Sequence, residues 1–482
     1  MDLVSRASLL FGASPAVMSA AKTFSFRNCS AMTSRIACSL YRKGLRSGST
    51  VAMLSPNTPE SVLMVMALQR TGLVCAPLNH RFPSESLHAS LSALQPDLLL
   101  ASDPSLIPRS CQVATASLPE MAAPVSGSEP VRFTPSENSM DRPLTIMHTS
   151  ASSGTPKAAL HSFANHWYNA LGAAGNMPLQ AGDCWLLSLP LFHVGGYAVL
   201  FRSLVSGSTV AVPELHETVE KSLERFPVTH LSLVPTQLYR LLRNPAALPK
   251  LRKLKALLLG GSAVPGTLLE KCIREGIPAY LSYGTTEMCS QIATTSEPVC
   301  STLNNSGSLL PFRELRIADD GEILVKGACL FQGYLREGKL FLPLDKEGWF
   351  HTGDTGNLDN SSTIHVTGRK DNMFISGGEN LHPEEIEQVL AEIEGIEHAV
   401  VVPVADHEYG CKPAAFLKTA VPGIPDDSSI SDAVTKKIGK LKTPVRYIRV
   451  CQLATLPGSQ KIDRKWYKQL VLTDPLQPDA SA

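Results

Sequence analysis

The chain has 482 residues, a formal net charge of +1 at pH 7 and 44% hydrophobic residues. This length is too great for a single hydrophobic core, so at least two domains are expected. The balanced charge excludes the basic surface with which proteins bind nucleic acids or anionic membranes. No stretch approaches the roughly 20 apolar residues of a membrane span, so stable membrane insertion is not expected.

The eleven cysteines are scattered along the chain, and no two of them form a C-x-x-C pair. An odd, dispersed set predicts reduced thiols rather than a disulfide framework or a zinc site. The apolar run over residues 7–18 is interrupted by Gly12, Ser14 and Pro15, which is atypical of a signal peptide. We therefore expect a cytoplasmic protein, and the composition leaves open whether it forms a homo-oligomer.

From residue 50 onward, apolar segments of strand length alternate with segments of helix length. Strands are expected over residues 51–54, 73–77, 97–101, 144–147, 230–234 and 254–259. Helices are expected over residues 59–70, 84–94 and 235–242. This alternation predicts the α/β class: a large N-terminal domain with layered, helix-covered, mostly parallel sheets. The Ser/Pro-rich region 102–142 is expected to be a surface excursion.

Residues 149–157 read Thr-Ser-Ala-Ser-Ser-Gly-Thr-Pro-Lys and follow a predicted strand. Hydroxyl groups, backbone N–H groups and a lysine around one point suit a polyphosphate. The same composition is common in flexible linkers. The strand before it and the apolar segment after it favour a phosphate-binding loop. The Walker A spacing is not met, so a P-loop NTPase is not expected.

Residues 280–291 read Tyr-Leu-Ser-Tyr-Gly-Thr-Thr-Glu-Met-Cys-Ser-Gln. Tyr283 offers a stacking face, Gly284 a tight turn and Thr286 a hydroxyl. The carboxylate of Glu287 is suited to bind Mg²⁺ if a nucleotide supplies the other ligands. The alternative is that Thr-Thr-Glu begins a helix, with Thr as its cap and Glu in the first turn.

Three further turns carry polar groups. Gly260-Gly261-Ser262, after a predicted strand, could bring backbone atoms to a planar ligand. Asp354, in Gly-Trp-Phe-His-Thr-Gly-Asp, is suited to accept hydrogen bonds from ribose hydroxyls. Arg369 could donate to ribose or phosphate, although either residue could be an ordinary turn former.

The apolar stretch 185–192 is followed by His193-Val194-Gly195-Gly196. A histidine beside two glycines at a strand end could line a pocket, because glycine allows a ligand close to the backbone. A histidine packed under a loop explains the pattern equally well.

Beyond Asp371 the chain changes character, with a helix expected over 383–392 and short strands over 399–404 and 414–418. This predicts two domains, residues 1–370 and a small α+β domain over 371–482. The second carries Lys461 in a polar, glycine-containing loop. A lone lysine is usually solvated, and Lys461 gains a function only if the small domain closes over the nucleotide.

Taken in order, these motifs, together with Gly-Glu-Ile-Leu-Val-Lys-Gly at 321–327 and Lys-Ile-Asp-Arg at 461–464, resemble the adenylate-forming superfamily. That superfamily contains acyl-CoA synthetases, luciferases and peptide-synthetase adenylation domains. The resemblance covers residues 51–464. It implies a two-step reaction that uses ATP, Mg²⁺ and CoA and passes through an acyl-adenylate.

The resemblance also implies residue roles. The phosphate loop would contain Thr149, Ser150, Ser152, Ser153, Gly154, Thr155 and Lys157. Adenine would be framed by Gly260, Gly261, Ser262, Tyr283 and Gly284, and the ribose would be held by Asp354 and Arg369. Thr286 would contact the α-phosphate and Glu287 would bind Mg²⁺. Lys461 would bridge the substrate carboxylate and the nucleotide. The hinge would be Asp371, and Gly377 and Gly378 would line the pantetheine channel.

Finer details resemble the o-succinylbenzoate–CoA ligases of menaquinone biosynthesis. These details are His148 and the segments 156–162, 189–196, 282–291 and 372–380. That substrate class keeps an aryl carboxylate free, and a free carboxylate in a partly apolar pocket requires a cation. Arg202 is the candidate. The acyl pocket would further comprise His193, Gly195 and Gly196, with Ser290 and Gln291 at its rim.

Several alternatives remain open at this point. Arg202 could form an ordinary surface salt bridge. The acid could be another aryl or medium-chain acid, the chain could bind nucleotide without catalysis, or it could load a carrier protein instead of CoA. Ala151 and Gln460 stand where many members of the superfamily have glycine, so the two loops that contain them could differ in shape.

Overall fold

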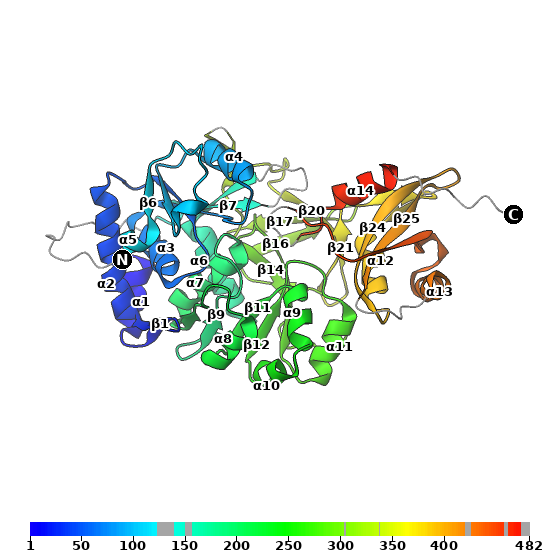
Figure 1. Ribbon diagram of the computed structural model, residues 1–482, viewed down its shortest axis with the longest axis horizontal. Coiled ribbons are helices and arrows are strands. Elements are labelled where there is room, and N and C mark those ends of the chain that lie inside the picture. Colours follow the sequence, from blue (N-terminus) through cyan, green and yellow to red (C-terminus); the bar gives the residue numbers. More distant parts are fainter. Residues whose placement is uncertain are drawn as a thin grey trace.

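The computed structural model describes residues 1–122, 139–149, 157–302, 305–336, 338–419, 426–456 and 461–473. Figure 1 shows a large N-terminal part, coloured blue to yellow, beside a smaller C-terminal part in orange and red. The predicted phosphate-loop residues Ser150, Ser152, Ser153, Gly154 and Thr155 lie outside the described residues.

An eight-stranded sheet has the order β19-β18-β8-β7-β4-β3-β5-β6. Its parallel centre is β7 (Pro143–Thr149), β4 (Val74–Leu78), β3 (Thr50–Leu54) and β5 (Leu98–Ala101). Helices α3 (Pro59–Thr71) and α4 (Ser84–Leu94) make the crossovers. β8 (Lys157–Ser162) runs antiparallel to β7 and places Thr149 opposite Lys157. The two ends of the predicted phosphate loop are therefore neighbours.

The prediction for residues 102–142 is wrong in part. β6 (Thr115–Ser117) pairs parallel with β5 and extends the sheet. α5 (Leu118–Ala122) buries Leu118 and Met121 in the core. Both elements are only three to five residues long, too short to show a periodicity in the sequence.

A nine-stranded sheet has the order β15-β14-β13-β12-β11-β9-β10-β1-β2. Its parallel strands are β13 (Ala279–Thr285), β12 (Ala256–Leu259), β11 (His230–Leu233), β9 (Cys184–Leu186) and β10 (Thr209–Ala211). β14 (Ser290–Thr294) returns antiparallel to β13. Helices α7 (Val194–Ser206), α9 (Pro235–Leu242) and α11 (Gly266–Arg274) lie in the connections. The expected α/β alternation is confirmed in both sheets.

The two large sheets share one hydrophobic core. Val51 of β3 and Val210 of β10 belong to the same cluster, together with Leu63 of α3 and Phe201 of α7. The remaining elements of this part are α1 (Leu3–Phe11), β1 (Pro15–Met18), β2 (Thr23–Ser25), α2 (Phe26–Arg42), α6 (Phe163–Ala173), α8 (Val219–Arg225), α10 (Leu248–Leu251), β15 (Ser308–Leu309), β18 (Gly333–Arg336) and β19 (Lys339–Phe341). No helix among the described residues is long and apolar enough to cross a membrane.

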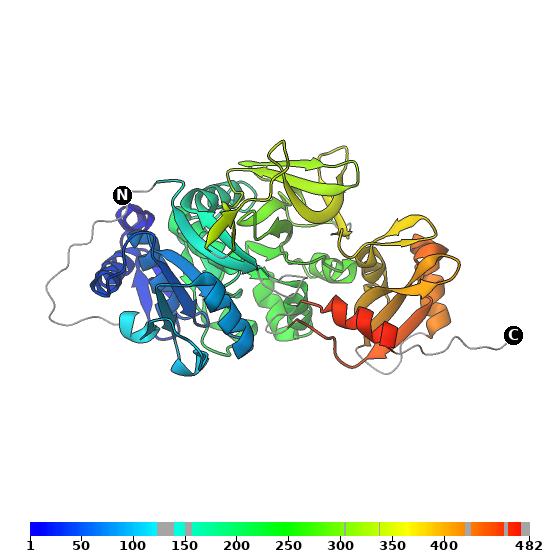
Figure 2. The same cartoon turned by 90° about the horizontal axis from the view of Figure 1, so that it is seen from above.

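A four-stranded antiparallel sheet follows: β16 (Arg313–Ile317), β17 (Glu322–Gly327), β20 (Phe350–Leu358) and β21 (Ile364–Arg369). In Figure 2 it lies at the top of the picture, in yellow-green, above the green elements of the nine-stranded sheet. Its last strand ends two residues before Asp371. The domain boundary at that residue stays a prediction.

The C-terminal part has a core of its own, which includes Ile386, Val401, Leu417 and Val434. It contains a hairpin of β22 (Phe374–Ser376) and β23 (Glu379–Leu381) and a sheet of β24 (Ile396–Asp406), β25 (Gly410–Thr419) and β26 (Arg446–Val450). Its helices are α12 (Pro383–Ala391), α13 (Asp427–Ile438) and α14 (Arg464–Thr473). This is the α+β module expected from the sequence, with longer strands than the pattern indicated.

Candidate active site

Asp354 is the centre of one half of the site. It lies on β20 directly opposite Arg369 on β21. One carboxylate oxygen, Oδ1, pairs with Arg369 Nη1 at 2.7 Å, and Oδ2 accepts a hydrogen bond of 2.6 Å from the Tyr283 hydroxyl. Burial raises the pKa of Asp354, while Arg369 and Tyr283 oppose that shift. Tyr283 is itself buried in a core cluster, so in this structure it anchors Asp354 through its hydroxyl.

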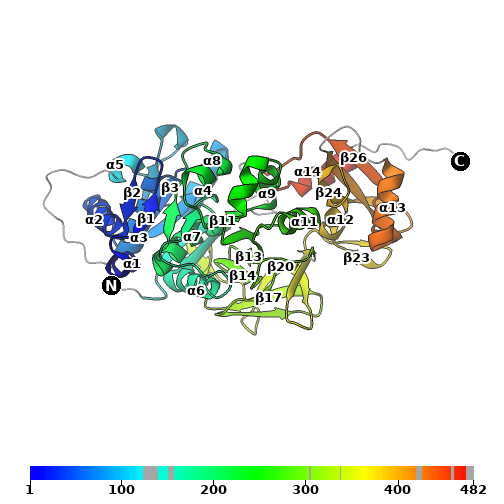
Figure 3. The ribbon, with the colours of Figure 1, turned by 90° about the horizontal axis from the view of Figure 1, so that it is seen from below.

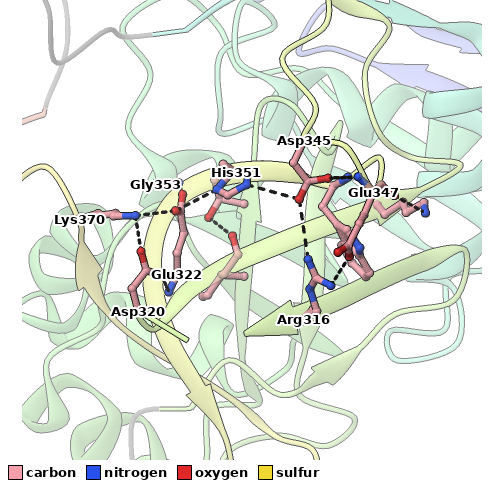
Figure 4. A network of polar contacts seen from close by, with 12 residues as sticks. Arg316, Asp320, Glu322, Asp345, Glu347, His351, Gly353 and Lys370 are labelled. Carbon is pink, nitrogen blue, oxygen red and sulfur yellow. Dashed lines mark hydrogen bonds and ion pairs between the residues drawn. The ribbon is translucent and has the colours of Figure 1, made fainter. Parts of the chain in front are cut away.

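A polar network holds the strands that carry Asp354 and Arg369 (Figure 4). Glu322 of β17 accepts hydrogen bonds from the Gly353 backbone N–H at 2.9 Å and from Lys370 at 2.9 Å. Gly353 precedes Asp354, and Lys370 follows Arg369. By binding these two neighbours, Glu322 helps to position Asp354 and Arg369. Burial alone would raise the pKa of Glu322, but bonds from Lys370, His351 and Gly353 outweigh it and the pKa is lowered.

Glu287 occupies the turn between β13 and β14. Its Oε1 accepts a hydrogen bond of 2.6 Å from the Tyr334 hydroxyl of β18. The Lys157 ammonium lies 5.2 Å from the centroid of the same tyrosine ring. Residues 286–289 form a turn between antiparallel strands, which rules out the alternative that this segment begins a helix.

A buried histidine, His161, holds the backbone at Thr286. The Thr286 carbonyl accepts a hydrogen bond of 2.7 Å from His161 Nε2. Burial lowers the pKa of His161 to about 4, so this histidine is a neutral donor at pH 7. Gly284 lies opposite Gln291, and a Cβ there would stand 1.9 Å from the Ser290 carbonyl oxygen. Only glycine permits this close approach.

Lys461 belongs to the C-terminal part, and its positive charge interacts with the carboxylates of Glu287 and Asp354. Lys461 keeps an exposed face. Partial removal of water lowers its pKa, and the carboxylates of Glu287 and Asp354 act in the opposite direction. Partial removal of water and the charge of Lys461 lower the pKa of His193, although the residue keeps an exposed face. The structure therefore pairs Asp354 with Arg369 and places Lys461 within electrostatic range of Glu287, Asp354 and His193, residues that lie in separate segments of the sequence.

The remaining predicted nucleotide residues follow β12. Gly261 has φ +86°, in the left-handed region that favours glycine, and Ser262 is exposed. A Cβ at Gly260 would lie 3.2 Å from the Ser282 carbonyl oxygen of β13, so this turn packs against the strand that carries Tyr283. Contact with adenine stays a prediction.

The expectation that His193 ends a strand is wrong. β9 stops at Leu186, and His193 is the residue before α7. Gly195 and Gly196 form the first turn of that helix. A Cβ at Gly196 would stand 2.2 Å from the Pro190 carbonyl oxygen, so this glycine lets α7 pack against the preceding loop. Sequence alone could not separate a helix start from a strand end, since β9 is only three residues long.

Arg202 lies on α7 and is only 5% exposed, which rules out the surface salt bridge. Its guanidinium carbon is 5.3 Å from the centroid of the Trp185 ring. Its Nε is buried without a hydrogen-bond partner, and no carboxylate among the described residues forms a salt bridge with it. Burial, with Arg313 nearby, lowers the pKa of Arg202 to about 10, so it stays charged at pH 7.

Gln291 is buried within the protein rather than at a rim, since it is only 3% exposed. Its Nε2 donates to Thr294 Oγ1 at 2.6 Å, and its Oε1 has no partner. Ser290, which precedes it, has φ 120°, outside the range favoured by residues with a side chain.

The two residues predicted for the CoA step lie in the β22–β23 hairpin. Gly377 and Gly378 have φ +56° and +86° and form its turn. Asp371 Oδ2 is 3.6 Å from Arg369 Nη2, so the predicted hinge residue touches the predicted ribose ligand. Their roles in CoA binding and in rotation stay predictions.

Sequence reasoning missed the groups that orient the predicted residues: Tyr334, His161, Glu322, His166 and Asn169. One signal was present for two of them. Buried α6 carries polar residues at 165, 166 and 169, which a purely structural core helix would not need.

Glu287, Asp354, Arg369 and Lys461 gather opposite charges at one place, an arrangement suited to a nucleotide and its metal ion. The sequence model of the AMP-binding enzyme family matches residues 6–335, and that of the AMP-binding enzyme C-terminal domain matches residues 385–459. The chain belongs to this family.

Among relatives, the chain is 35% identical to 2-succinylbenzoate–CoA ligase of Salmonella typhimurium, over 89% of each chain. It is 33% identical to the protein of the same name from Escherichia coli, over 92% of this chain and 93% of the other. Among solved structures, o-succinylbenzoate CoA synthetase from Bacillus subtilis with its acyl-adenylate intermediate has a TM-score of 0.86 at 30% identity, and covers 97% of this chain and 98% of that one. The same enzyme with ATP and magnesium ion also has a TM-score of 0.86, at 30% identity, and covers 97% of this chain and 99% of that one.

Proposed function

We propose that this chain is an ATP-dependent o-succinylbenzoate–CoA ligase that acts in menaquinone biosynthesis. The observation that carries the proposal is the buried charge of Arg202. A guanidinium removed from water without a carboxylate partner is costly, and a ligand carboxylate would offset that cost. The names of the relatives and of the bound molecules in the similar structures support the same substrate.

The first step joins the succinyl carboxylate to the nucleotide. A carboxylate oxygen forms a bond to the α-phosphorus of ATP, and the bond from that phosphorus to pyrophosphate breaks. Both reactants are anionic, so the reaction needs positive charge near the α-phosphate. Lys461 and Lys157 can supply it, while Asp354 and Arg369 hold the ribose and Arg202 holds the aryl carboxylate.

The donor set fits a magnesium ion. The Tyr334 hydroxyl orients the carboxylate of Glu287 by a bond to one of its oxygens, and Mg²⁺ binds through one or two carboxylates plus phosphate oxygens. When bound, the ion would neutralise phosphate charge and favour the departure of pyrophosphate.

The second step transfers the acyl group to CoA. The CoA thiol gives up its proton to solvent as its sulfur forms a bond to the acyl carbon, the bond from that carbon to the phosphate oxygen breaks, and AMP leaves. A small domain that rotates about Asp371 would remove Lys461 and present the Gly377-Gly378 turn. The free cysteines fit a reducing compartment, and we place this activity in the cytoplasm. The oligomeric state stays open.

The test is ATP- and CoA-dependent release of AMP with o-succinylbenzoate, benzoate, 4-chlorobenzoate and octanoate. Wild type, Arg202→Met and Arg202→Lys are compared, because lysine keeps the charge and methionine keeps only the apolar stem. We expect turnover of o-succinylbenzoate, a loss of at least about tenfold in kcat/KM for Arg202→Met, and partial retention for Arg202→Lys. A preference for a monocarboxylate would leave adenylation intact and make the chain another aryl- or medium-chain acyl-CoA synthetase.

A further inference from the structure

Helix α6 carries a row of polar side chains although it is buried. Asn165, His166 and Asn169 are 6%, 2% and 1% exposed. The two asparagines bind backbone carbonyls of other segments: Asn165 binds those of Ala328 and Leu330. A buried polar residue that finds partners in this way orients the segments it joins.

Asn169 connects the proposed carboxylate site to the strand that follows Glu287. Its Nδ2 donates to the carbonyl oxygens of Met288 at 3.2 Å and Gln291 at 3.3 Å. Its Oδ1 accepts from Arg202 Nη2 at 3.5 Å. The guanidinium can only donate and the two carbonyls can only accept, so this amide orientation satisfies all three contacts at once.

The turn that Asn169 holds is strained. Cys289 and Ser290 have φ values of 59° and 120°, and they are the only two consecutive non-glycine residues with positive φ in the described part of the chain. His166 supports the same turn, since its Nδ1 lies 3.0 Å from Cys289 Sγ while its Nε2 lies 2.7 Å from Thr145 Oγ1. Strain of this kind persists only where surrounding contacts enforce it.

The amide of Asn169 is neutral, so it adds no charge beside the guanidinium of Arg202. An aspartate would have the same shape and would pair with Arg202. The existing amide orients the guanidinium without cancelling its charge. Arg313, which also faces this region, donates to the Gln291 carbonyl through Nε at 2.7 Å and adds no negative charge.

We propose that Asn169 is a positioning residue: it orients Arg202 and leaves the arginine charge free for the aryl carboxylate of the substrate. This inference rests on the proposed function. It assigns Asn169 no contact with the reacting atoms, and it predicts an effect on the choice of acid rather than on the chemistry of adenylation.

The test compares two acids on the Asn169→Asp variant. One is o-succinylbenzoate, and the other is 4-oxo-4-phenylbutanoate, the same keto acid without its aryl carboxylate. We expect the KM for o-succinylbenzoate to rise at least about tenfold, because a charge-assisted contact is lost to the new aspartate. The KM for ATP and the kcat/KM for 4-oxo-4-phenylbutanoate should stay within about threefold of wild type.

Asn165→Asp is the matched control. It places a carboxylate on the same helix, also against two carbonyl oxygens, and it does not touch Arg202. Its preference between the two acids should equal that of wild type. Asn169→Ala provides a second variant in case Asn169→Asp does not fold. It removes the amide without adding charge. It should raise the KM for o-succinylbenzoate selectively, by a smaller factor than Asn169→Asp does.

Equal losses with both acids would overturn the inference and make Asn169 a structural residue of α6. An unchanged KM for o-succinylbenzoate in Asn169→Asp would overturn it as well. Failure of the wild type to use o-succinylbenzoate would instead remove the proposed function, so the two failures are distinguishable.

Discussion

Under the proposed function, Lys461 is the residue through which the C-terminal part would act on the first half-reaction. Replacement by alanine removes the ammonium that lies in the field of Glu287 and Asp354. We expect acid-dependent exchange of pyrophosphate into ATP to fall by roughly a hundredfold or more, as for the loss of one electrostatic donor. Transfer of a preformed acyl-adenylate to CoA should stay within a few-fold. A similar loss in both half-reactions would contradict a role limited to adenylation.

Asp354 offers a second residue test. Asp354→Asn removes the negative charge of the carboxylate. That carboxylate pairs with the Arg369 guanidinium and accepts a hydrogen bond from the Tyr283 hydroxyl. The KM for ATP should rise about tenfold or more, since a charged hydrogen bond contributes roughly 1.5–3 kcal/mol. Tyr283→Phe removes one hydrogen bond and keeps the charge, so its effect should be smaller. An equal rise in the KM for the acid would indicate a general loss of structure.

Candidate residues that stand in contiguous motifs could be named from sequence, whereas the side chains that contact them could not. Glu287, Asp354, Arg369 and Lys461 stand in short motifs with chemistry of their own. Tyr334, which binds Glu287, comes from a strand 47 residues away and has no local signal. Arg202 was a candidate, but its burial and its missing carboxylate partner depend on the tertiary packing of α7.

At the scale of elements, the four-stranded sheet β16-β17-β20-β21 supports Asp354 and Arg369, the residues predicted to hold the ribose. Glu322→Gln should lower the free energy of unfolding at pH 7 by about 1–2 kcal/mol, because bonds from Lys370 and the Gly353 N–H weaken. The expected loss of stability is small because the Lys370 side chain is 42% exposed, so water screens its interaction with Glu322. Urea unfolding of both proteins measures the difference. Glu314→Gln on β16, an exposed position, is the control.

The pH dependence of that difference has a defined sign. The folded protein lowers the pKa of Glu322 below its ordinary value of 4.5. Its contribution is therefore complete above pH 4.5 and is lost as the pH falls through the folded pKa. The stabilities of wild type and Glu322→Gln should converge on acidification. A difference that is constant with pH would show that the glutamate charge does not contribute.

Long elements with a clear period were predictable, and short ones were not. α4 and α9 have the predicted bounds, because their apolar positions and flanking prolines are local features. β6, β9 and α5 are short, and tertiary packing determines their conformation. The helix start at Val194 was missed for a related reason: Gly195 and Gly196 in its first turn are poor helix formers, and only the tertiary structure shows that Gly196 packs against the Pro190 carbonyl.

At the scale of the whole molecule, polar contacts join the N-terminal and C-terminal parts around Glu397 of β24. Its Oε1 accepts from the Tyr239 hydroxyl of α9 at 3.0 Å and from Arg243 at 3.2 Å. Its Oε2 pairs with Lys418 of β25 at 2.8 Å. Figure 3 shows α9 and α11 facing α12 and β24. Glu397 is well shielded, since its side chain is only 10% exposed.

These contacts accompany the arrangement in which Lys461 lies near Glu287, and a rotation of the small domain would have to break them. Tyr239→Phe and Glu397→Gln should therefore shift the population toward other arrangements. We expect the rate of adenylation to fall about two- to fivefold, as for the loss of one hydrogen bond of roughly 0.5–1 kcal/mol. Transfer to CoA should be unchanged or faster, because less free energy opposes the rotation.

Single-turnover measurements of the two half-reactions separate these effects. Asp427→Asn, which weakens a pair with Arg449 inside the small domain, is the matched control and should alter neither rate. If Tyr239→Phe slows both half-reactions equally, the contact only stabilises the fold. If it slows adenylation alone, the hydrogen bond between α9 and β24 contributes to the balance between the two arrangements, and Glu397→Gln should show the same selectivity with a larger factor.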